Sequence, residues 1–599
     1  MSEFQIVDAP PGTGKTFTAC RRIVWLVEQG VHAHQIWMIS FTRAAIAELR
    51  IRIRQLSKDG HAVDGLVAST LDSRAWHLVN GFTTRGGRAL VGGHEHTIDE
   101  AIALLQNPPD ELAEWLASIR HLVVDEAQDL VGSRARLLHA ILAALPQGCG
   151  VTIFGDRAQA IYGFAEDSHR DTADPFIRQC MTRYFGRVVA RGLTRVFRTD
   201  NDGLQRLFDD TRSELLDRLE VGGEIAYIWL RDLLLTGFPA DDFEDPDRFD
   251  LQLHRRRFAA LDEAMWALAQ GEPGRLRLSG YPRAITPWLG MVFGECVESV
   301  LYRADFERLI ADASAKWQGS CWPQLDEAWS VLRLLAPLPG GALSLHQLRL
   351  VLASGNVPDL LLLPEFGFNG SIYSTIHASK GREAGQVDVE LPPNFENGET
   401  NWEEEARVLF VAATRASRDL VVKEGKRLYI ARASDGRDVR RVNGGSRRCQ
   451  IEVGLEGDLD LPSVISGSRA DVAASQRVLA LAHDRTTRLR ARLPGRSDGD
   501  WSRYRLFEEE RSHEPIDSRH LGKLSSRFYW MLKDTGTRFW PDKRNFPPPY
   551  IQHIHSLGAR TVVFAPDDPS YVDAAEPFAS SGFFLAPMVI GLPTIPFFT

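Results

Sequence analysis

The sequence predicts an α/β fold built on doubly wound parallel sheets, and two segments carry this prediction. The first is a short apolar strand at residues 4–8, followed by a glycine-rich turn at 9–16 and then by apolar positions at helical spacing. The second is the apolar run 121–124, which ends in Asp125 and Glu126. Adjacent carboxylates at the carboxyl end of a strand lie where α/β sheets bind their ligands.

The glycine-rich turn has the composition of a phosphate-binding loop. Its glycines allow backbone N–H groups to close around phosphate oxygens at a helix N-terminus. Lys15 would then meet the β- and γ-phosphates of ATP, and the Thr16 hydroxyl would bind Mg²⁺. Asp125 would hold the same Mg²⁺, and Glu126 would orient and deprotonate the attacking water. The predicted nucleotide-binding residues of the turn are Ala9, Pro10, Pro11, Gly12, Thr13, Gly14, Lys15 and Thr16.

Bulk composition narrows the classes of protein that fit. A chain of 599 residues is too long for one hydrophobic core, so about three to five domains are expected. The net charge of -9 argues against a basic nucleic-acid coat but allows a local basic channel. Six scattered cysteines without a CxxC pair fit a reducing cytoplasm and exclude the usual zinc-ribbon spacing. No signal peptide or membrane span is evident, which predicts a cytoplasmic protein, associated with the nucleoid in a prokaryote.

Five further segments, taken with these two, resemble the motif series of UvrD/Rep-like superfamily 1A DNA helicases. The resemblance implies two RecA-like domains with the ATP site in the cleft between them. It also implies an ATP-dependent DNA helicase that moves 3′→5′ on single-stranded DNA or a partial duplex. The five segments are residues 40–52, 155–164, 193–199, 374–383 and 404–416.

The resemblance assigns nucleotide-contact roles outside the loop. Arg198 and Arg415 occupy positions where arginines of the second lobe stabilise charge on the γ-phosphate in the transition state. Gln159 stands where the family senses the γ-phosphate and couples it to DNA. The remaining positions are Phe197, which would stack on the base, Glu383, which would contact the ribose, and Arg52.

The resemblance also places DNA contacts. Tyr162 and Phe164 would stack on bases of single-stranded DNA, an interaction worth about 1–3 kcal/mol per base whatever the sequence. Packing of both rings in a core is the alternative interpretation. The other matching positions are Phe41, Thr42, Thr70, Thr375 and His377.

Several features depart from the family pattern. The glutamine that the family carries about twenty residues before the loop has no counterpart, so base selectivity is relaxed, or supplied elsewhere, or the start codon lies upstream. Asp72 replaces the family's histidine two residues after Thr70, which places a negative charge near the predicted DNA path. Both accessory insertions are short, which puts processive unwinding in doubt but leaves translocation and ATP hydrolysis unaffected.

The predicted organisation has three parts. A first RecA-like domain spans residues 1–190 with a small insertion at about 75–118, and a second spans 191–445 with an insertion at about 266–354. Residues 446–599 are predicted to form a C-terminal α+β module. Its apolar end, 583–598, is predicted to be a buried terminal segment or a docking peptide.

Three functions fit these observations. The first is a DNA helicase in repair, recombination or mobile-element defence. The second is an ATP-fuelled translocase that remodels protein–DNA complexes without processive unwinding. The third is a nucleotide-gated subunit of a nuclease or effector complex, in which the C-terminal module binds a protein partner.

Overall fold

The computed structural model divides the chain into two compact units. The first comprises Met1–Pro246 and Ser379–Glu424, and the second comprises Asp247–Ala378 and Gly425–Thr599. Residues 43, 44, 47 and 94 are described by their backbone alone. The structure describes all other residues except 1–2, 41–42, 83–93, 162–175, 185, 241–248, 320, 356, 394–399, 443–446, 496–499, 510–519, 542–543 and 599.

The first unit is built on a six-stranded sheet in the order β3-β2-β4-β5-β1-β6. All neighbouring strands pair in parallel, as the sequence predicts. The two predicted strands at 4–8 and 121–124 are confirmed as β1 and β4. The strands are β1 Phe4–Asp8, β2 Ile36–Ser40, β3 Val67–Thr70, β4 His121–Val124, β5 Gly150–Gly155 and β6 Val188–Gly192.

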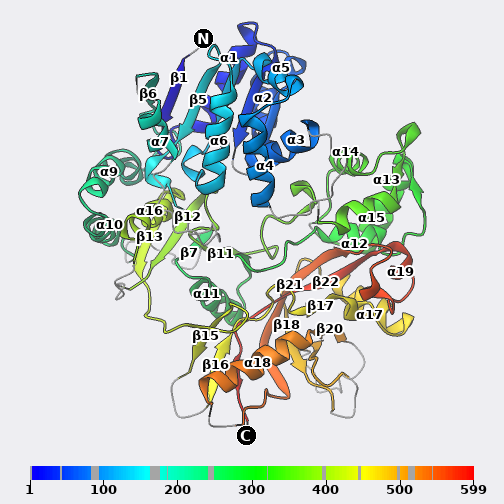
Figure 1. The fold of residues 1–599 in the computed structure, drawn as a ribbon. Coiled ribbons are helices and arrows are strands. Elements are labelled where there is room, and N and C mark those ends of the chain that lie inside the picture. Colours follow the sequence, from blue (N-terminus) through cyan, green and yellow to red (C-terminus); the bar gives the residue numbers. More distant parts are fainter. Residues whose placement is uncertain are drawn as a thin grey trace. The chain divides into compact units, whose positions relative to one another are not determined.

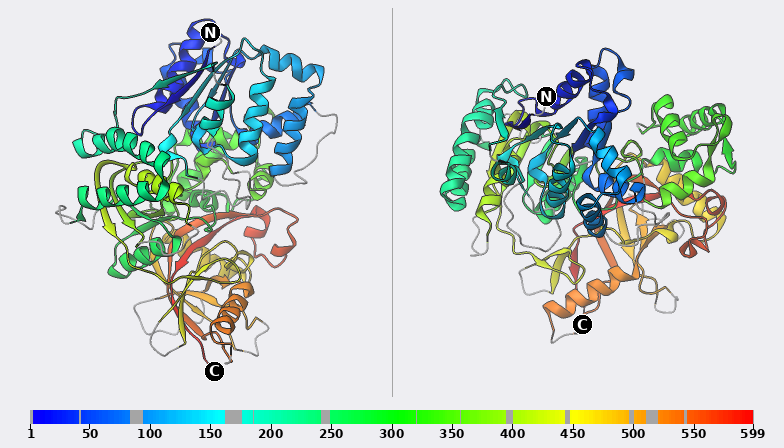
Figure 2. Two further views of the ribbon diagram at one scale, coloured as in Figure 1. Left: turned by 60° about the vertical axis from the view of Figure 1, so that its left-hand side comes forward. Right: turned by 45° about the horizontal axis from the view of Figure 1, so that its top comes forward.

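Helices cover both faces of this sheet (Figure 1 and Figure 2). Alternate residues of β1 show the division, because Val7 packs in one core with α1 and α2, whereas Phe4 and Ile6 pack in another core with α3–α7. This arrangement is the doubly wound α/β architecture. The helices are α1 Lys15–Glu28, α2 Arg43–Leu56, α3 Leu71–Phe82, α4 His94–Gln106, α5 Asp110–Ser118, α6 Gly132–Ala144 and α7 Phe176–Arg183.

The first unit also contains segments that the sequence assigns to the second lobe. Strands β12 and β13 pair in parallel, and α10 packs against α16. The two units therefore do not coincide with the predicted lobes at 1–190 and 191–445, whose boundaries stay predictions. These elements are α8 Asp202–Arg206, α9 Arg212–Val221, α10 Gly223–Gly237, β12 Ala384–Leu391, α16 Trp402–Ala413 and β13 Ala416–Glu424.

The second unit combines three parallel strands with antiparallel sheets. Strand β11 (Ser371–Thr375) pairs in parallel with β7 (Leu251–His254) and β8 (Gly274–Arg277). The antiparallel sheets have the orders β14-β15-β16-β23 and β17-β20-β19-β18-β21-β22. Their strands are β14 Ala431–Arg432, β15 Asp438–Arg441, β16 Arg448–Ile451, β17 Leu459–Asp460, β18 Thr487–Arg492, β19 Arg505–Glu508, β20 His520–Leu524, β21 Tyr550–Val563, β22 Phe583–Gly591 and β23 Thr594–Pro596.

The predicted insertion and the C-terminal module share one hydrophobic core. Helix α12 packs against β21 and β22, and residues of α13–α15 join the same cluster. Strand β22 is buried along its whole length, which confirms a buried terminal segment. The remaining elements are α11 Arg257–Gln270, α12 Pro287–Phe293, β9 Val300–Leu301, α13 Arg303–Lys316, α14 Leu325–Leu335, β10 Leu343–Ser344, α15 Leu345–Ala353, α17 Arg469–Leu481, α18 Ser526–Phe539 and α19 Phe578–Ser581.

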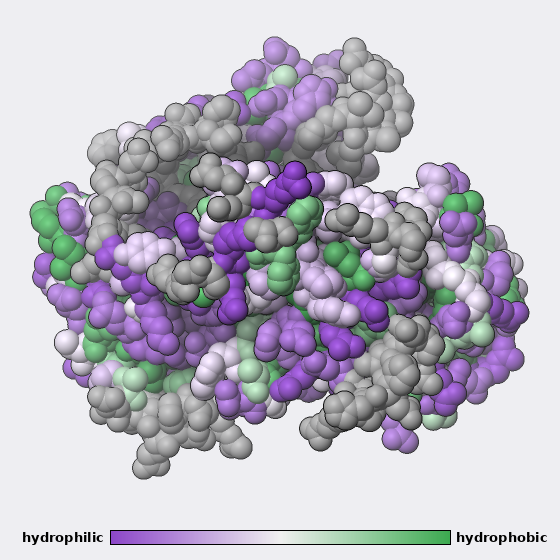
Figure 3. All heavy atoms as spheres, turned by 90° about the horizontal axis from the view of Figure 1, so that it is seen from below, coloured by the Kyte–Doolittle hydropathy of each residue, from purple (hydrophilic) through white to green (hydrophobic). Residues whose placement is uncertain are grey.

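The surface is mixed in character. On the face drawn in Figure 3, hydrophilic residues predominate and hydrophobic residues are scattered among them in small groups. Across the residues that the structure describes, we find no helix with both the length and the apolar character needed to cross a membrane.

Candidate nucleotide-binding site

The loop between β1 and α1 has the backbone shape of a phosphate cradle. Gly12 and Gly14 both adopt left-handed conformations, with φ of 71° and 77°. A Cβ at Gly12 would lie 2.6 Å from the Cβ of Arg198, so the position has no room for a side chain. Ala9 N donates to Gly155 O at 2.9 Å, and Thr13 Oγ1 donates to Pro10 O at 2.7 Å. The loop is therefore fixed before any ligand enters.

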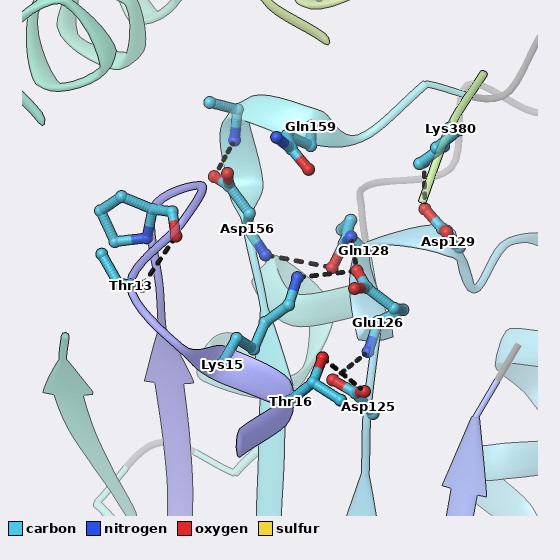
Figure 4. A network of polar contacts seen from close by, with 12 residues as sticks. Thr13, Lys15, Thr16, Asp125, Glu126, Gln128, Asp129, Asp156, Gln159 and Lys380 are labelled. Atoms are coloured by element: carbon cyan, nitrogen blue, oxygen red, sulfur yellow. Dashed lines mark hydrogen bonds and ion pairs between the residues drawn. The ribbon is translucent and has the colours of Figure 1, made fainter. Parts of the chain in front are cut away.

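Four polar side chains meet beside this loop (Figure 4). Lys15 Nζ donates to Glu126 Oε2 at 2.7 Å, and Thr16 Oγ1 donates to Asp125 Oδ2 at 3.5 Å. Asp125 is buried at the end of β4, and Glu126 adopts a left-handed φ of 53° directly after it. A hydroxyl and a carboxylate that converge in this way are hard oxygen ligands of the kind that Mg²⁺ binds. These residues fit magnesium and a nucleotide phosphate.

The charges in this cluster stabilise one another. Burial alone would raise the pKa of Glu126, but the Lys15 ammonium and its hydrogen bond outweigh burial and lower that pKa. Burial alone would lower the pKa of Lys15, and here Glu126 and Asp125 reverse the effect and raise it. Both groups therefore remain charged at neutral pH, and Glu126 is held as a carboxylate beside the Lys15 ammonium.

Gln128 is a site residue that the sequence reasoning missed. Its Nε2 donates to Glu126 Oε2, and its Oε1 accepts from Asp156 N at 3.0 Å. Asp156 Oδ1 in turn accepts from Ala158 N at 3.0 Å, at the start of the turn that contains Gln159. One buried amide thus connects Glu126 to the segment of Gln159. Its position two residues after Glu126 is the feature of the sequence that could have indicated this role.

Arg212 was also missed, because it lies outside every recognised motif. It is buried, and its Nη2 contacts Asp8 Oδ1 at 2.6 Å while its Nε contacts Asp156 Oδ1 at 2.9 Å. Asp8 ends β1 just before the loop, and Asp156 follows β5. A single guanidinium from α9 therefore fixes the ends of two neighbouring strands beside the nucleotide loop.

A second ion pair involves Lys380, within the segment 374–383 that the sequence singles out. Lys380 pairs with Asp129, and both side chains are largely buried (Figure 4). Asp129 follows Glu126 by three residues in the turn after β4. The pair therefore connects the turn that follows Asp125 and Glu126 to Lys380, within the segment 379–383 of the first unit.

The structure brings four predicted residues together around Thr414. Gln159 Nε2 donates to Thr414 Oγ1 at 3.0 Å, and Arg198 Nη1 donates to Thr414 O at 2.7 Å. Arg198 also pairs with Glu383. Arg415 Nη2 donates to Thr414 Oγ1 at 3.3 Å. The γ-phosphate sensor and both arginines predicted from sequence therefore belong to one hydrogen-bond network.

The two arginines of this network have different surroundings. Arg415 is buried, and its guanidinium also donates to Val411 O at 2.9 Å and to Arg382 O at 3.2 Å. Burial and the neighbouring Arg198 charge lower the pKa of Arg415 to about 10, so it stays cationic at neutral pH. Arg198 is held directly against the loop, since the adjacent Phe197 N donates to Gly12 O at 2.8 Å. The Phe197 ring is 65% exposed, and the guanidinium carbon of Arg195 lies 4.9 Å from its centroid.

Other predicted residues have structural partners here. Arg52 pairs with Glu48 one turn away on α2, at 2.9 Å, and among the described residues no hydrogen bond joins it to the loop. Thr70 Oγ1 accepts from Ser73 N at 3.3 Å at the start of α3, which is a helix-capping contact. Thr375 Oγ1 likewise accepts from Ala378 N at 3.3 Å, in the turn after β11 that also holds His377.

The predicted DNA contacts Phe41, Thr42, Tyr162 and Phe164 lie outside the described residues. Asp72, whose negative charge the sequence predicts near the DNA path, is paired with Arg134. Asp72 accepts from Arg134 Nε at 3.1 Å and from Arg134 Nη2 at 3.2 Å. The carboxylate is therefore paired, and the charge it presents to a DNA strand is smaller than the sequence alone suggests.

Comparison with known proteins supports the fold of the first unit. Residues 1–165 match the family model described as an AAA domain. This segment contains β1–β5, the loop and both carboxylates. The first unit has a RecA-like P-loop fold. No curated protein matches the chain.

Two solved helicases align with much of the chain at low similarity. Pif1 helicase from Candida albicans is 13% identical, covers 70% of this chain and 91% of its own, and has a TM-score of 0.32. Pif1 helicase from Bacteroides, in complex with ADP-AlF3 and ssDNA, is 14% identical, covers 70% and 89%, and has a TM-score of 0.30.

Proposed function

We propose that this protein is an ATP-driven motor on single-stranded DNA, a superfamily 1 helicase or translocase. The observation that carries the proposal is the hydrogen-bond network around Thr414. It joins Gln159, Arg198 and Arg415, which come from three motif segments far apart in sequence, and Phe197 N next to Arg198 contacts the loop backbone. A simple NTPase needs only the loop and the carboxylates. A motor also needs contacts through which the state of the nucleotide changes the position of other segments.

In this proposal the residues of the first unit bind ATP and prepare water for attack. Lys15 and the loop backbone bind the phosphates, and Thr16 with Asp125 binds the Mg²⁺, which neutralises phosphate charge when bound. Glu126, oriented by Gln128, accepts the proton of the attacking water. Arg198 and Arg415 supply positive charge from two other segments, so hydrolysis depends on how those segments are placed.

Coupling to DNA would run through Gln159. Its side chain binds Thr414, and its backbone leads directly into Tyr162 and Phe164, the predicted base-stacking residues. Loss of the γ-phosphate would change the partners of Gln159 and thereby the position of the stacking segment. The resemblance to the UvrD/Rep family supports single-stranded DNA as the track and 3′→5′ as the direction.

The proposal is tested by strand displacement on three duplexes, with a 3′ tail, with a 5′ tail and with blunt ends. The wild type is compared with Lys15→Ala, and Lys58→Ala, an exposed lysine of the same unit, is the matched control. We expect ATP-dependent displacement of the 3′-tailed duplex only, lost in Lys15→Ala and kept in Lys58→Ala.

Two other outcomes change the proposal in defined ways. Displacement of only the 5′-tailed duplex would overturn the direction and keep the motor. Removal of a streptavidin block from single-stranded DNA without duplex unwinding would favour the translocase, as the short predicted insertions suggest. Absence of every ATP-dependent activity on DNA would overturn the motor.

A further inference from the structure

The second unit contains a cavity that has no part in the proposed ATP site. It lies between the segment at 282–285, the end of α15, the loop at 454–461 and strands β20, β21 and β22. Its volume is about 440 Å³. Ligand pockets of folded proteins are typically about 300–1,000 Å³, so this cavity is large enough for a small organic molecule.

Most of the cavity wall is apolar. Leu352 and Val357 line it beside α15, Leu524 ends β20, and Val562 and Val589 come from β21 and β22. Such a wall favours a ligand with an apolar body, because burial of apolar surface drives association.

The wall is also held in shape before a ligand enters. Asp458 Oδ2 accepts from Gly454 N at 2.9 Å and from Leu455 N at 3.0 Å, which closes the loop on itself. The buried Arg437 pairs with the other Asp458 oxygen at 2.6 Å. Asp458 therefore lines the cavity with its charge already paired with Arg437, and it holds the loop from Gly454 to Asp458 in place.

Two cations belong to the described lining, and they differ in their partners. Arg283 is exposed and pairs with Asp359 at 3.1 Å. Arg560 Nε is buried without a hydrogen-bond partner, and no ion pair with Arg560 occurs among the described residues. Burial lowers the pKa of Arg560 to about 10, against an opposing effect of Glu456, so the guanidinium remains charged at neutral pH. A buried cation without a paired anion is unfavourable in a folded protein.

We propose that this cavity binds a small amphipathic anion, with a carboxylate or phosphate head on Arg560 and an apolar body against the surrounding aliphatic side chains. Carboxylate and phosphate groups each present two oxygens that a guanidinium can bind with two parallel hydrogen bonds. Glu456 and Asp458 also line the cavity, but neither accepts a hydrogen bond from Arg560 Nε, and the ligand would supply that acceptor. The site is independent of the ATP site, since every wall residue belongs to the second unit.

The test is calorimetric titration of the full chain with four probes: decanoate, decyl phosphate, decanol and inorganic phosphate. We expect one molecule of decanoate or decyl phosphate to bind per chain. Decanol should bind at least about tenfold more weakly because it loses the charge-assisted contact. Inorganic phosphate should also bind at least about tenfold more weakly because it lacks the apolar body. The stronger of the two charged probes identifies the head group. Equal affinity for decanol would overturn the role of Arg560, and equal affinity for inorganic phosphate would overturn the role of the apolar wall.

Three variants place the binding in this cavity. Arg560→Met should weaken the charged probes about tenfold or more, and Arg283→Met is the matched control that should leave them unchanged. Ala353→Leu narrows the cavity from the end of α15 and should weaken all three decyl probes, which keeps the test valid if Arg560→Met fails to fold. Unchanged binding in both Arg560→Met and Ala353→Leu would overturn the site.

Discussion

The two units bury charged groups for different purposes. In the first unit, Glu126 and Asp156 follow strand ends, and Arg212 of α9 reaches Asp156 from a segment far away in sequence. In the second unit, Arg437 is enclosed by Asp435 and Asp458, and Arg257 is paired with Glu452. The first network opens toward a glycine loop shaped for an anion, whereas the charges of the second are paired with one another, including Asp458 where it lines the cavity. Burial of charge therefore indicates function only where the network ends on a surface that a ligand can reach.

The largest expected effect comes from Glu126, the proposed general base of the first network. Glu126→Gln should lower kcat for ATP by about 10²–10⁴-fold, because a glutamine cannot accept the proton of the attacking water. ATP binding, followed with a fluorescent analogue, should persist. Glu214→Gln, an exposed glutamate of the same unit, is the control and should leave kcat unchanged. Hydrolysis at the wild-type rate in Glu126→Gln would remove Glu126 from the mechanism.

Two arginine variants sharpen the contrast between the networks. Arg437→Met and Arg212→Met should each lower the free energy of unfolding by about 3–5 kcal/mol, because each leaves buried carboxylates without a partner. Only Arg212→Met should also lower the ATPase rate of the protein that remains folded. The measurements are urea unfolding and ATPase activity, with Arg136→Met, an exposed arginine of the first unit, as the control. An equal loss of ATPase activity in Arg437→Met would contradict the claim that only the charge network of the first unit supports ATP hydrolysis.

A buried histidine shows that polar groups of the first unit can also be structural. Burial lowers the pKa of His121 in β4 from 6.5 to about 3, so the folded state holds it neutral while the unfolded state binds a proton below pH 6.5. Because protonation of His121 favours the unfolded state, the free energy of unfolding falls as the pH drops through about 6.5. The fall attributable to His121 is about 2 kcal/mol between pH 7 and pH 5. His121→Gln should show a smaller loss of unfolding free energy over that interval. Identical losses in the variant and the wild type would contradict the assignment.

The smallest predicted effect concerns the orientation of Glu126. Gln128→Leu should lower kcat about tenfold with little change in KM, because the carboxylate loses the amide that positions it. Gln106→Leu, on the exposed side of α4, is the matched control. A change in KM alone would assign Gln128 to nucleotide binding instead.

The sequence predicts local features of this protein well, because they depend on neighbours along the chain. Strand β1, the loop, α1 and the carboxylates after β4 all follow from residue order and spacing. The role of Arg212 does not, because its contact with Asp8 joins residues 204 positions apart. The pairing of Asp72 with Arg134 spans 62 positions and was missed for the same reason. The shared core of the predicted insertion and the C-terminal module depends on long-range antiparallel pairing, for which a single sequence gives no register.

The central claim is that ATP hydrolysis in the first unit is coupled to single-stranded DNA. It is tested most directly by the steady-state ATPase rate with and without single-stranded DNA, in the wild type, in Tyr162→Ala and in the exposed-aromatic control Tyr429→Ala. We predict that DNA raises the rate of the wild type and of Tyr429→Ala, and that Tyr162→Ala keeps the basal rate but loses the stimulation. If the wild-type rate is the same with DNA, with RNA and without nucleic acid, the motor is contradicted and a nucleotide-gated interaction subunit becomes the better account.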